Sequence, residues 1–142
     1  MLVNNAGGAL KMPKGGFVDM PMVYWDEQIA LNLNSAAYCS QLAARCMIEK
    51  GFHGSIINIS SIHSLVTWVK RKALPYSAGK AGMNMFTKSI GVELIKYGIN
   101  VNCVAPGGMV TPGAIFNNTT TAELYGPEWT RYVTEYGAGV PV

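Results

Sequence analysis

Tyr76 and Lys80 are the two residues of this sequence whose types and spacing most directly suggest chemistry. They stand four positions apart in a segment with helical periodicity, so both side chains are expected to project from one helix face. A free tyrosine has a pKa of about 10 and is a poor base at neutral pH. An ammonium group within a few ångströms favours the phenolate and lowers that pKa. The pair can therefore pass a proton to or from a substrate oxygen.

Two other polar residues are candidates for the same site. Ser61 follows a β-like run, and a serine hydroxyl at a strand end can hydrogen-bond a carbonyl oxygen and stabilise charge as it develops. The neighbouring Ser60 is better explained as a turn residue at the strand end. Asn32 lies inside a helical segment, where asparagine is a mediocre helix former, and taken alone it indicates only an exposed helix position. Because a Tyr-x-x-x-Lys spacing is weak evidence by itself, these residues need a fold that brings them together.

The elements that must do so alternate along the chain. Three short runs rich in β-branched residues, at 2–4, 55–59 and 100–105, are typical of fully buried strands. Helical patterns fill the gaps, at about 23–50 and 76–97, and each is followed by a glycine. Strand, long helix, strand, long helix, strand predicts a parallel α/β sheet with right-handed crossovers.

Polar and glycine-rich turns follow all three predicted strands. Asn5-Ala6-Gly7-Gly8 follows the first, Ser60-Ser61 the second, and Pro106-Gly107-Gly108 the third. The carboxyl ends of parallel strands lie at one edge of the sheet, where α/β proteins bind their ligands. The sequence therefore predicts a site at this edge.

Composition narrows the class of protein. Of 142 residues, 49% are hydrophobic and 13% charged, and the charged fraction is low against about 25% for soluble domains, which excludes extensive disorder. No apolar run approaches the roughly 20 residues of a membrane span, and no secretory signal is visible at the N-terminus. With a net charge of +3, the only basic cluster is Lys70-Arg71-Lys72. We interpret it as a solvated loop and expect no nucleic-acid partner.

The cysteines point to a reducing compartment. Cys39, Cys46 and Cys103 are odd in number and lack C-x-x-C spacing. This pattern argues against a disulfide framework and against a zinc site, so no metal is expected. We expect the protein to be cytoplasmic.

The sequence resembles the short-chain dehydrogenase/reductase family in five motifs that occur in the family's order. Asn4-Asn5-Ala6-Gly7 looks like the Asn-Asn-Ala-Gly turn after the family's fourth strand, and Asn32 matches the helix asparagine of its catalytic tetrad. Ser61 matches the serine after the fifth strand, and Tyr76-Ser77-Ala78-Gly79-Lys80 is similar to Tyr-x-x-x-Lys. The segment 102–107 resembles the Asn-x-x-x-Pro-Gly turn after the sixth strand. The resemblance runs from Met1 to about Val142.

The resemblance implies hydride transfer between NAD or NADP and an alcohol or ketone. It gives Tyr76 the role of acid/base and lets Ser61 orient and polarise the substrate oxygen. Lys80 would lower the tyrosine pKa and hold the ribose hydroxyls, and Asn32 would hold a water molecule of a proton relay. The implied cofactor-binding residues are Asn5, Ala6, Gly7, Tyr76, Lys80, Pro106, Gly107, Met109 and Thr111, and the implied substrate contacts are His63 and Trp68.

His63 has a simpler explanation. A loop histidine such as His63, with no paired carboxylate, is more often exposed to solvent than bound to substrate.

Within the family, the stretch from Ser61 to Trp68 together with the segment 76–88 looks somewhat like sugar and polyol dehydrogenases. The family commonly pairs its helices between subunits, so the resemblance also implies a homo-oligomer. Glycines at 79, 82 and 91 of the second helix each cost about 1 kcal/mol against alanine, and close helix packing would be a reason to keep them.

The sequence departs from the family at the nucleotide-binding end. Such a unit opens with a Gly-rich turn that admits a pyrophosphate, and neither Gly-x-x-x-Gly-x-Gly nor Gly-x-Gly-x-x-Gly occurs here. Met1 falls within the family's fourth strand. We therefore expect residues 1–142 to be an incomplete, middle portion of one doubly wound, Rossmann-like domain, with the family's mobile lid at about 112–137. The polypeptide alone is expected to be inactive. The alternative is a non-catalytic remnant that only packs against or binds partner subunits.

Overall fold

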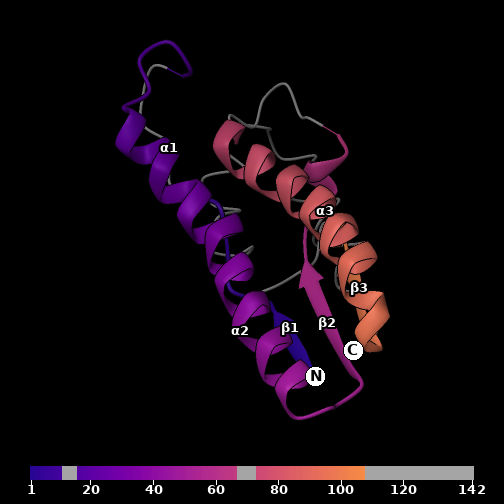
Figure 1. Ribbon diagram of the computed structural model, residues 1–142. Helices are drawn as coiled ribbons and strands as arrows, with labels where there is room; N and C mark the ends of the chain where they lie inside the picture. The colour runs from indigo at the N-terminus through magenta and orange to yellow at the C-terminus, as the bar shows by residue number, and fades with distance from the viewer. Residues whose placement is uncertain (11–15, 67–72, 108–142) are drawn as a thin grey trace. The chain divides into compact units, whose positions relative to one another are not determined.

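The computed structural model describes residues 1–10, 16–66 and 73–107 (Figure 1). The strands are β1 (Leu2–Asn4), β2 (Gly54–Ile59) and β3 (Ile99–Val104). The α-helices are α1 (Met22–Ile29), α2 (Ser35–Glu49) and α3 (Leu74–Leu94). Three short helical segments complete the list: a π-helix η1 (Ala30–Asn34) and the 3-10 helices η2 (Ile62–Ser64) and η3 (Ile95–Tyr97). All of them belong to one compact unit, Met1–Pro106.

The three strands form a parallel sheet in the order β1-β2-β3. The register places Leu2, Ile56 and Val101 side by side. Two residues further along each strand, it places Asn4, Asn58 and Cys103 side by side. Because β1 pairs with β2 and β2 with β3 in parallel, the carboxyl ends of all three strands lie at one edge. The predicted parallel α/β arrangement is confirmed, and every strand begins and ends within one residue of its predicted position.

Helices α2 and α3 cover the same face of the sheet. Ala44 of α2 and Leu94 of α3 meet the fully buried Ile56 and Ile99, and Leu2, Met47, Ile90 and Val101 pack around this cluster. On the other face Val3 and Val104 are about half exposed. Within the described part of the chain, no helix has both the length and the apolar character needed to cross a membrane.

The first long helix is interrupted by a π-helical turn, which the sequence did not predict. Figure 1 shows α1, η1 and α2 as one continuous rod. At the junction the backbone N–H of Ser35 donates to the carbonyl of Ala30, five residues earlier. Such wide turns often occur at functional sites, and this one contains Asn32.

Close packing explains two of the three glycines of α3. A methyl group at Gly79 would lie 3.2 Å from the Cβ of Asn32, and one at Gly82 would lie 3.0 Å from Cδ2 of Leu33. Both positions therefore let α3 approach η1 within the same chain, as expected for helix packing. A methyl group at Gly91 would meet Val101 of β3 at 3.7 Å, which is an ordinary contact.

Candidate active site

Tyr76 and Lys80 lie in the first two turns of α3 and project from one face, as predicted. The ammonium Nζ of Lys80 is 5.9 Å from the centroid of the Tyr76 ring. Tyr76 is half-buried, whereas Lys80 is only 3% exposed. Pro75 stands at the start of the helix, where its missing N–H costs no hydrogen bond. The beginning of α3 thus places a phenol beside a buried cation.

Lys80 is held from the strand side of the site. Its Nζ donates to the carbonyl of Ile59, the last residue of β2, at 2.8 Å. Burial lowers the pKa of Lys80 below its ordinary value, and the nearby Cys103 thiol opposes the shift to a smaller extent. The buried Ser60 donates its hydroxyl to the carbonyl of Lys80 at 3.0 Å, which agrees with a structural role for that serine.

Asn32 is completely buried, so the interpretation of an exposed helix position is wrong. Its side chain pairs with the peptide of Gly8: Oδ1 accepts from the Gly8 N–H at 3.0 Å, and Nδ2 donates to the Gly8 carbonyl at 3.0 Å. Nδ2 also reaches the carbonyl of Gln28, one turn earlier, at 3.0 Å. The amide therefore joins the π-helical turn to the loop that follows β1.

Gly7 brings the two helices and this loop to one point. Its backbone has φ +155°, a conformation that favours glycine, and a methyl group here would lie 2.9 Å from Oδ1 of Asn32 and 3.0 Å from Nζ of Lys80. Gly7, Asn32 and Lys80 come from three separate elements. Their convergence is the tightest feature of the site.

Ser61 begins the 3-10 turn η2 directly after β2. Its residue is mostly buried, and its Oγ accepts the backbone N–H of His63 at 3.2 Å. The ring of His63 contacts that of Tyr76 edge to face, with 6.1 Å between centroids. His63 is half-buried, so its expected exposure to solvent is wrong. Through His63, the serine and the tyrosine belong to one group of contacts.

The remaining predicted residues divide between the sheet edge and undescribed parts of the chain. Asn5, Ala6 and Gly7 are exposed at the end of β1. Pro106 follows β3, and its carbonyl accepts the N–H of Ile62 at 2.8 Å; Gly107 comes next and is exposed. The other predictions fall outside the described residues: Trp68, the cluster Lys70-Arg71-Lys72, Met109, Thr111 and the lid expected at about 112–137.

Sequence reasoning missed a buried polar network under the site. Nδ2 of Asn4 donates to Asn58 Oδ1 at 2.7 Å and to Ser40 Oγ at 2.9 Å. Nδ2 of Asn58 donates to Thr87 Oγ1 at 2.9 Å, and Thr87 donates to the carbonyl of Met83 at 2.8 Å. The network joins β1 and β2 to α2 and α3. Asn58, a polar residue inside a run of isoleucines, was the available signal.

Gln28 and Tyr24 were also missed. Both are buried on the face of α1 that leads to Asn32. Oε1 of Gln28 lies 3.3 Å from Nδ2 of Asn32, and its own Nε2 has no hydrogen-bond partner among the described residues. The hydroxyl of Tyr24 donates to the carbonyl of Leu10 at 2.8 Å, and burial raises its pKa. With Asn32, Tyr24 secures the loop after β1 along α1.

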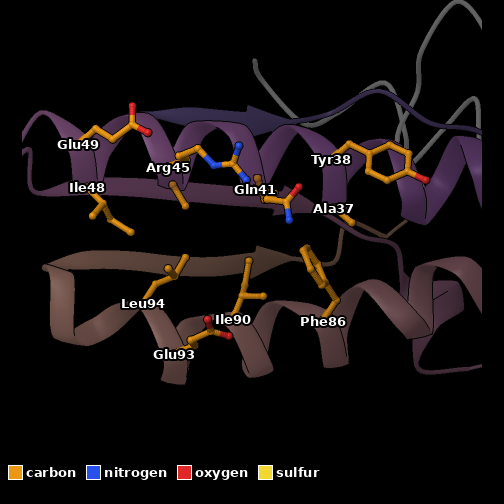
Figure 2. A pocket seen from close by; sticks show the side chains of 12 residues that line it. Ala37, Tyr38, Gln41, Arg45, Ile48, Glu49, Phe86, Ile90, Glu93 and Leu94 are labelled. Carbon is orange, nitrogen blue, oxygen red and sulfur yellow. The ribbon is translucent and has the colours of Figure 1, made fainter.

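A separate groove of about 690 Å³ lies between α2 and α3. Figure 2 shows Ile48 of α2 directed toward Leu94 of α3, and Arg45 extended along α2 beside Gln41. The groove contains none of the residues grouped around Tyr76. Among the described residues, no cluster of histidine, cysteine or acidic side chains could hold a metal ion, and all three cysteines are free.

A family model described as short chain dehydrogenase matches residues 1–122. The chain belongs to the short-chain dehydrogenase family. The protein named "Uncharacterized oxidoreductase YohF" of Escherichia coli (strain K12) is 40% identical over 112 residues, which is 79% of this chain and 42% of that protein. Carbonyl reductase [NADPH] 2 of Sus scrofa is 43% identical over 111 residues, covering 78% of this chain and 43% of the reductase.

The solved structures give the same family. The crystal structure of acetoin dehydrogenase YohF from Salmonella typhimurium matches with a TM-score of 0.70 and 43% identity, over 78% of this chain and 42% of that one. This short-chain dehydrogenase sequence thus spans about two fifths of the length of the curated relatives it matches, which are 42% and 43% covered. The predicted family and fold class are confirmed.

Proposed function

We propose that this chain carries the catalytic part of an NAD(P)-dependent oxidoreductase acting on a small alcohol or ketone. The observation that carries the proposal is the convergence of buried Lys80 with Tyr76, Asn32 and Gly7. Lys80 Nζ is 5.9 Å from the Tyr76 ring, and Gly7 packs against both Nζ of Lys80 and Oδ1 of Asn32. A buried ammonium and a phenol side by side at the carboxyl edge of the sheet are the pair of groups that proton transfer to or from a substrate oxygen requires.

In this proposal Tyr76 transfers the proton and Ser61 binds the reacting oxygen. The Ser61 Oγ accepts from the N–H of His63, so its own O–H hydrogen is left to donate toward a substrate oxygen. A donor aimed at an oxygen that gains negative charge stabilises the transition state more than the ground state. Tyr76 donates its proton to that oxygen during reduction and removes it during oxidation.

The residues present fit the nicotinamide and ribose half of a dinucleotide. Lys80 gives one of its three ammonium hydrogens to Ile59, which leaves the others for acceptors such as ribose hydroxyls. Asn5, Ala6 and Gly7 are exposed at the same sheet edge, and Pro106, Gly107, Met109 and Thr111 are the proposed contacts after β3. When bound, NAD or NADP supplies the hydride donor or acceptor. Asn32 is the proposed holder of a relay water.

The proposed substrate is a small carbonyl compound or its alcohol. The support is the similarity to proteins named carbonyl reductase and acetoin dehydrogenase. His63 touches the Tyr76 ring and is the proposed substrate contact on the serine side. Trp68 is the second proposed substrate contact. The weaker resemblance to sugar and polyol dehydrogenases makes polyols the second substrate class to test.

The test compares two tyrosines that each lie beside a lysine. Tyr76 has Lys80 at 5.9 Å, and Tyr97 has Lys96 at 5.0 Å from its ring centroid. The whole product of the reading frame that encodes this chain is assayed with NADH or NADPH and acetoin or diacetyl, by the absorbance of the reduced nicotinamide. Tyr76→Phe should abolish turnover while cofactor affinity stays nearly unchanged, and Tyr97→Phe should keep both.

Turnover that survives in Tyr76→Phe at the wild-type rate would refute the assignment. A wild-type product that binds neither dinucleotide would favour the alternative of a non-catalytic chain that packs against partner subunits. A salt-sensitive affinity for DNA would instead revive nucleic-acid binding, which we do not expect.

We also propose that the protein forms a homo-oligomer through the groove between α2 and α3. The groove is bordered by apolar side chains, including the exposed Tyr38 and Ile48, and by charges of both signs at Arg45 and Glu93. A surface with both signs of charge can pair with a copy of itself across a two-fold axis. Ile48→Arg should lower the mass in sedimentation equilibrium, whereas Val18→Arg, outside the groove, should not. A monomeric wild-type protein would contradict the proposal.

Cytoplasmic residence is the corresponding proposal for localisation. Its support is that Cys39 and Cys46 are exposed free thiols, which persist in a reducing compartment. Cell fractionation should recover the protein with cytoplasmic markers. Recovery from an oxidising compartment would contradict it.

A further inference from the structure

A chain of hydrogen bonds runs from β3 through α3 to the loop that carries Ser61. Sγ of Cys103 donates to Oδ1 of Asn84 at 3.3 Å. Nδ2 of Asn84 donates to Oγ of Ser64 at 2.7 Å, and Oγ of Ser64 donates to the carbonyl of Ser61 at 2.6 Å. None of these contacts involves Tyr76, Lys80 or Asn32.

Every donor in this chain points toward Ser61. The thiol of Cys103 gives its hydrogen to the Asn84 oxygen, which places the Asn84 NH₂ on the side of Ser64. Oγ of Ser64 accepts a hydrogen bond from the Asn84 NH₂ and donates its own hydrogen to the Ser61 carbonyl. Hydrogen bonds arranged in one direction polarise and strengthen one another. Asn84 sets the direction of this series of hydrogen bonds, because among Cys103, Asn84 and Ser64 only Asn84 has a side-chain amide, with a separate donor and acceptor.

The position of the Ser61 side chain depends on the turn that these bonds hold. Oγ of Ser61 is bound by the N–H of His63, which belongs to η2. Ser64 is the last residue of that three-residue turn, and Leu65 and Val66 beyond it are exposed. So short a helix has few internal hydrogen bonds, here from the N–H of Ser64 to the Ser61 carbonyl and from the N–H of Leu65 to the Ile62 carbonyl, and side chains from other elements add to them. Asn84 provides such a tie to α3.

We propose that Asn84 is a positioning residue that acts through Ser64 to orient Ser61 toward the substrate oxygen. The inference rests on the proposed function, since it assumes that Ser61 binds that oxygen. Asn84 itself has no contact with the reacting atoms in this scheme. Because the oriented hydroxyl acts on the developing charge, its misplacement lowers kcat and changes KM little.

The first experiment removes the two links separately and together. Asn84→Ala and Ser64→Ala are made in the whole gene product, and kcat and KM for the carbonyl substrate are measured. Each should lower kcat about 10-fold to 100-fold, the range expected when a reacting group is misplaced by a fraction of an ångström to an ångström. The double variant should lose no more than the worse single one, because both changes break one chain. Additive losses in the double variant would overturn the proposal.

A second pair of variants tests direction rather than packing. Asn84→Asp keeps the size of the side chain and its acceptor for Cys103, but it has no N–H for Ser64. The Ser64 hydroxyl then turns to the carboxylate and leaves the Ser61 carbonyl, so Asn84→Asp should match Asn84→Ala in kcat. Ser64→Thr keeps the hydroxyl and should retain most of the wild-type kcat. Wild-type kcat in Asn84→Asp would overturn the proposal even if Asn84→Ala failed to fold.

Tyr76→Phe separates this inference from the function on which it rests. If Tyr76→Phe retains wild-type turnover, the proposed function is refuted and the role of Asn84 with it. If Tyr76→Phe is inactive while Asn84→Ala and Asn84→Asp keep wild-type kcat, only the role of Asn84 is refuted. Loss of kcat in both Asn84 variants, with cofactor affinity unchanged, supports it.

Discussion

Replacing Gly79 by alanine tests how closely α3 packs against the π-helical turn that contains Asn32. Alanine at a helix-interior glycine gains about 1 kcal/mol in helix propensity. At Gly79 the new Cβ would lie 3.2 Å from the Cβ of Asn32, a separation that requires the neighbour to move by a few tenths of an ångström. Asn32 cannot move easily, because its amide is hydrogen-bonded to the N–H and the carbonyl of Gly8 and to the carbonyl of Gln28.

The expected magnitude follows from these two opposing effects. Overpacking at a tightly held site costs about 1–3 kcal/mol, so Gly79→Ala should change the free energy of unfolding by about 0 to −2 kcal/mol. Gly91 in the same helix is the matched control. Its Cβ would meet Val101 at 3.7 Å, an ordinary contact, so Gly91→Ala should gain up to about 1 kcal/mol.

The assay is urea denaturation of both variants, followed by far-ultraviolet circular dichroism. For a slope of about 1–3 kcal/mol per molar urea, a difference of about 2 kcal/mol separates the two midpoints by roughly 1 M. Gly79→Ala should also lower turnover, since the displaced Asn32 no longer holds the Gly8 loop in place. The reasoning is refuted if Gly79→Ala is as stable as Gly91→Ala.

Three other changes follow from described contacts. Thr87→Val removes the acceptor of Asn58 Nδ2 and should cost about 1–3 kcal/mol in denaturant unfolding, whereas Thr87→Ser keeps the hydroxyl; equal stability of the two variants would contradict this. Burial lowers the pKa of Lys80 in the folded state below 10.5. Between this lowered pKa and 10.5, the folded state binds fewer protons than the unfolded state, so the free energy of unfolding rises with pH. Relative to Lys80→Met, the wild-type protein should therefore gain stability as the pH rises toward 10.5, and a relative loss would contradict the burial of the cation. Gly98 has φ +68°, so Gly98→Ala should lose about 1–2 kcal/mol, and the His53 ring beside it adds to the loss; an unchanged Tm would show that the turn tolerates a side chain.

The strands, and the site at the carboxyl edge of the sheet, could be predicted from the sequence because their signals are local. Isoleucine and valine runs between turn residues mark buried strands, and alternation with long helical segments implies parallel pairing. The spacing of Tyr76 and Lys80 was enough to place both on one helix face, and their 5.9 Å approach agrees with it. The roles assigned to them stay predictions, as do the expected lid and the contacts of Trp68 and Thr111.

What the sequence could not supply depends on tertiary packing. Asn32 looked exposed because a regular helix offers no reason to bury an amide, and the π-helical turn that accounts for its environment has no marker in residue propensity. Gln28 was overlooked for the same reason, since glutamine on a helix is ordinarily a surface residue. His63 was taken as exposed because nothing local indicated the Tyr76 ring across from it.

The extra residue in η1 is taken up within a single wide turn. The N–H of Ser35 bonds to the carbonyl of Ala30, so five residues fill the turn that four would fill in an α-helix. Deleting one residue from Ala30–Asn34 would therefore convert the rod into an uninterrupted helix with little rotation of α1 relative to α2, so Ala44 would still face the sheet and Tyr24 would still reach the Leu10 carbonyl. The deletion would act on the turn itself, and so on the two hydrogen bonds by which Asn32 holds Gly8, while composition and hydrophobicity stay almost unchanged. Length, more than residue identity, is the property of this segment that the site depends on.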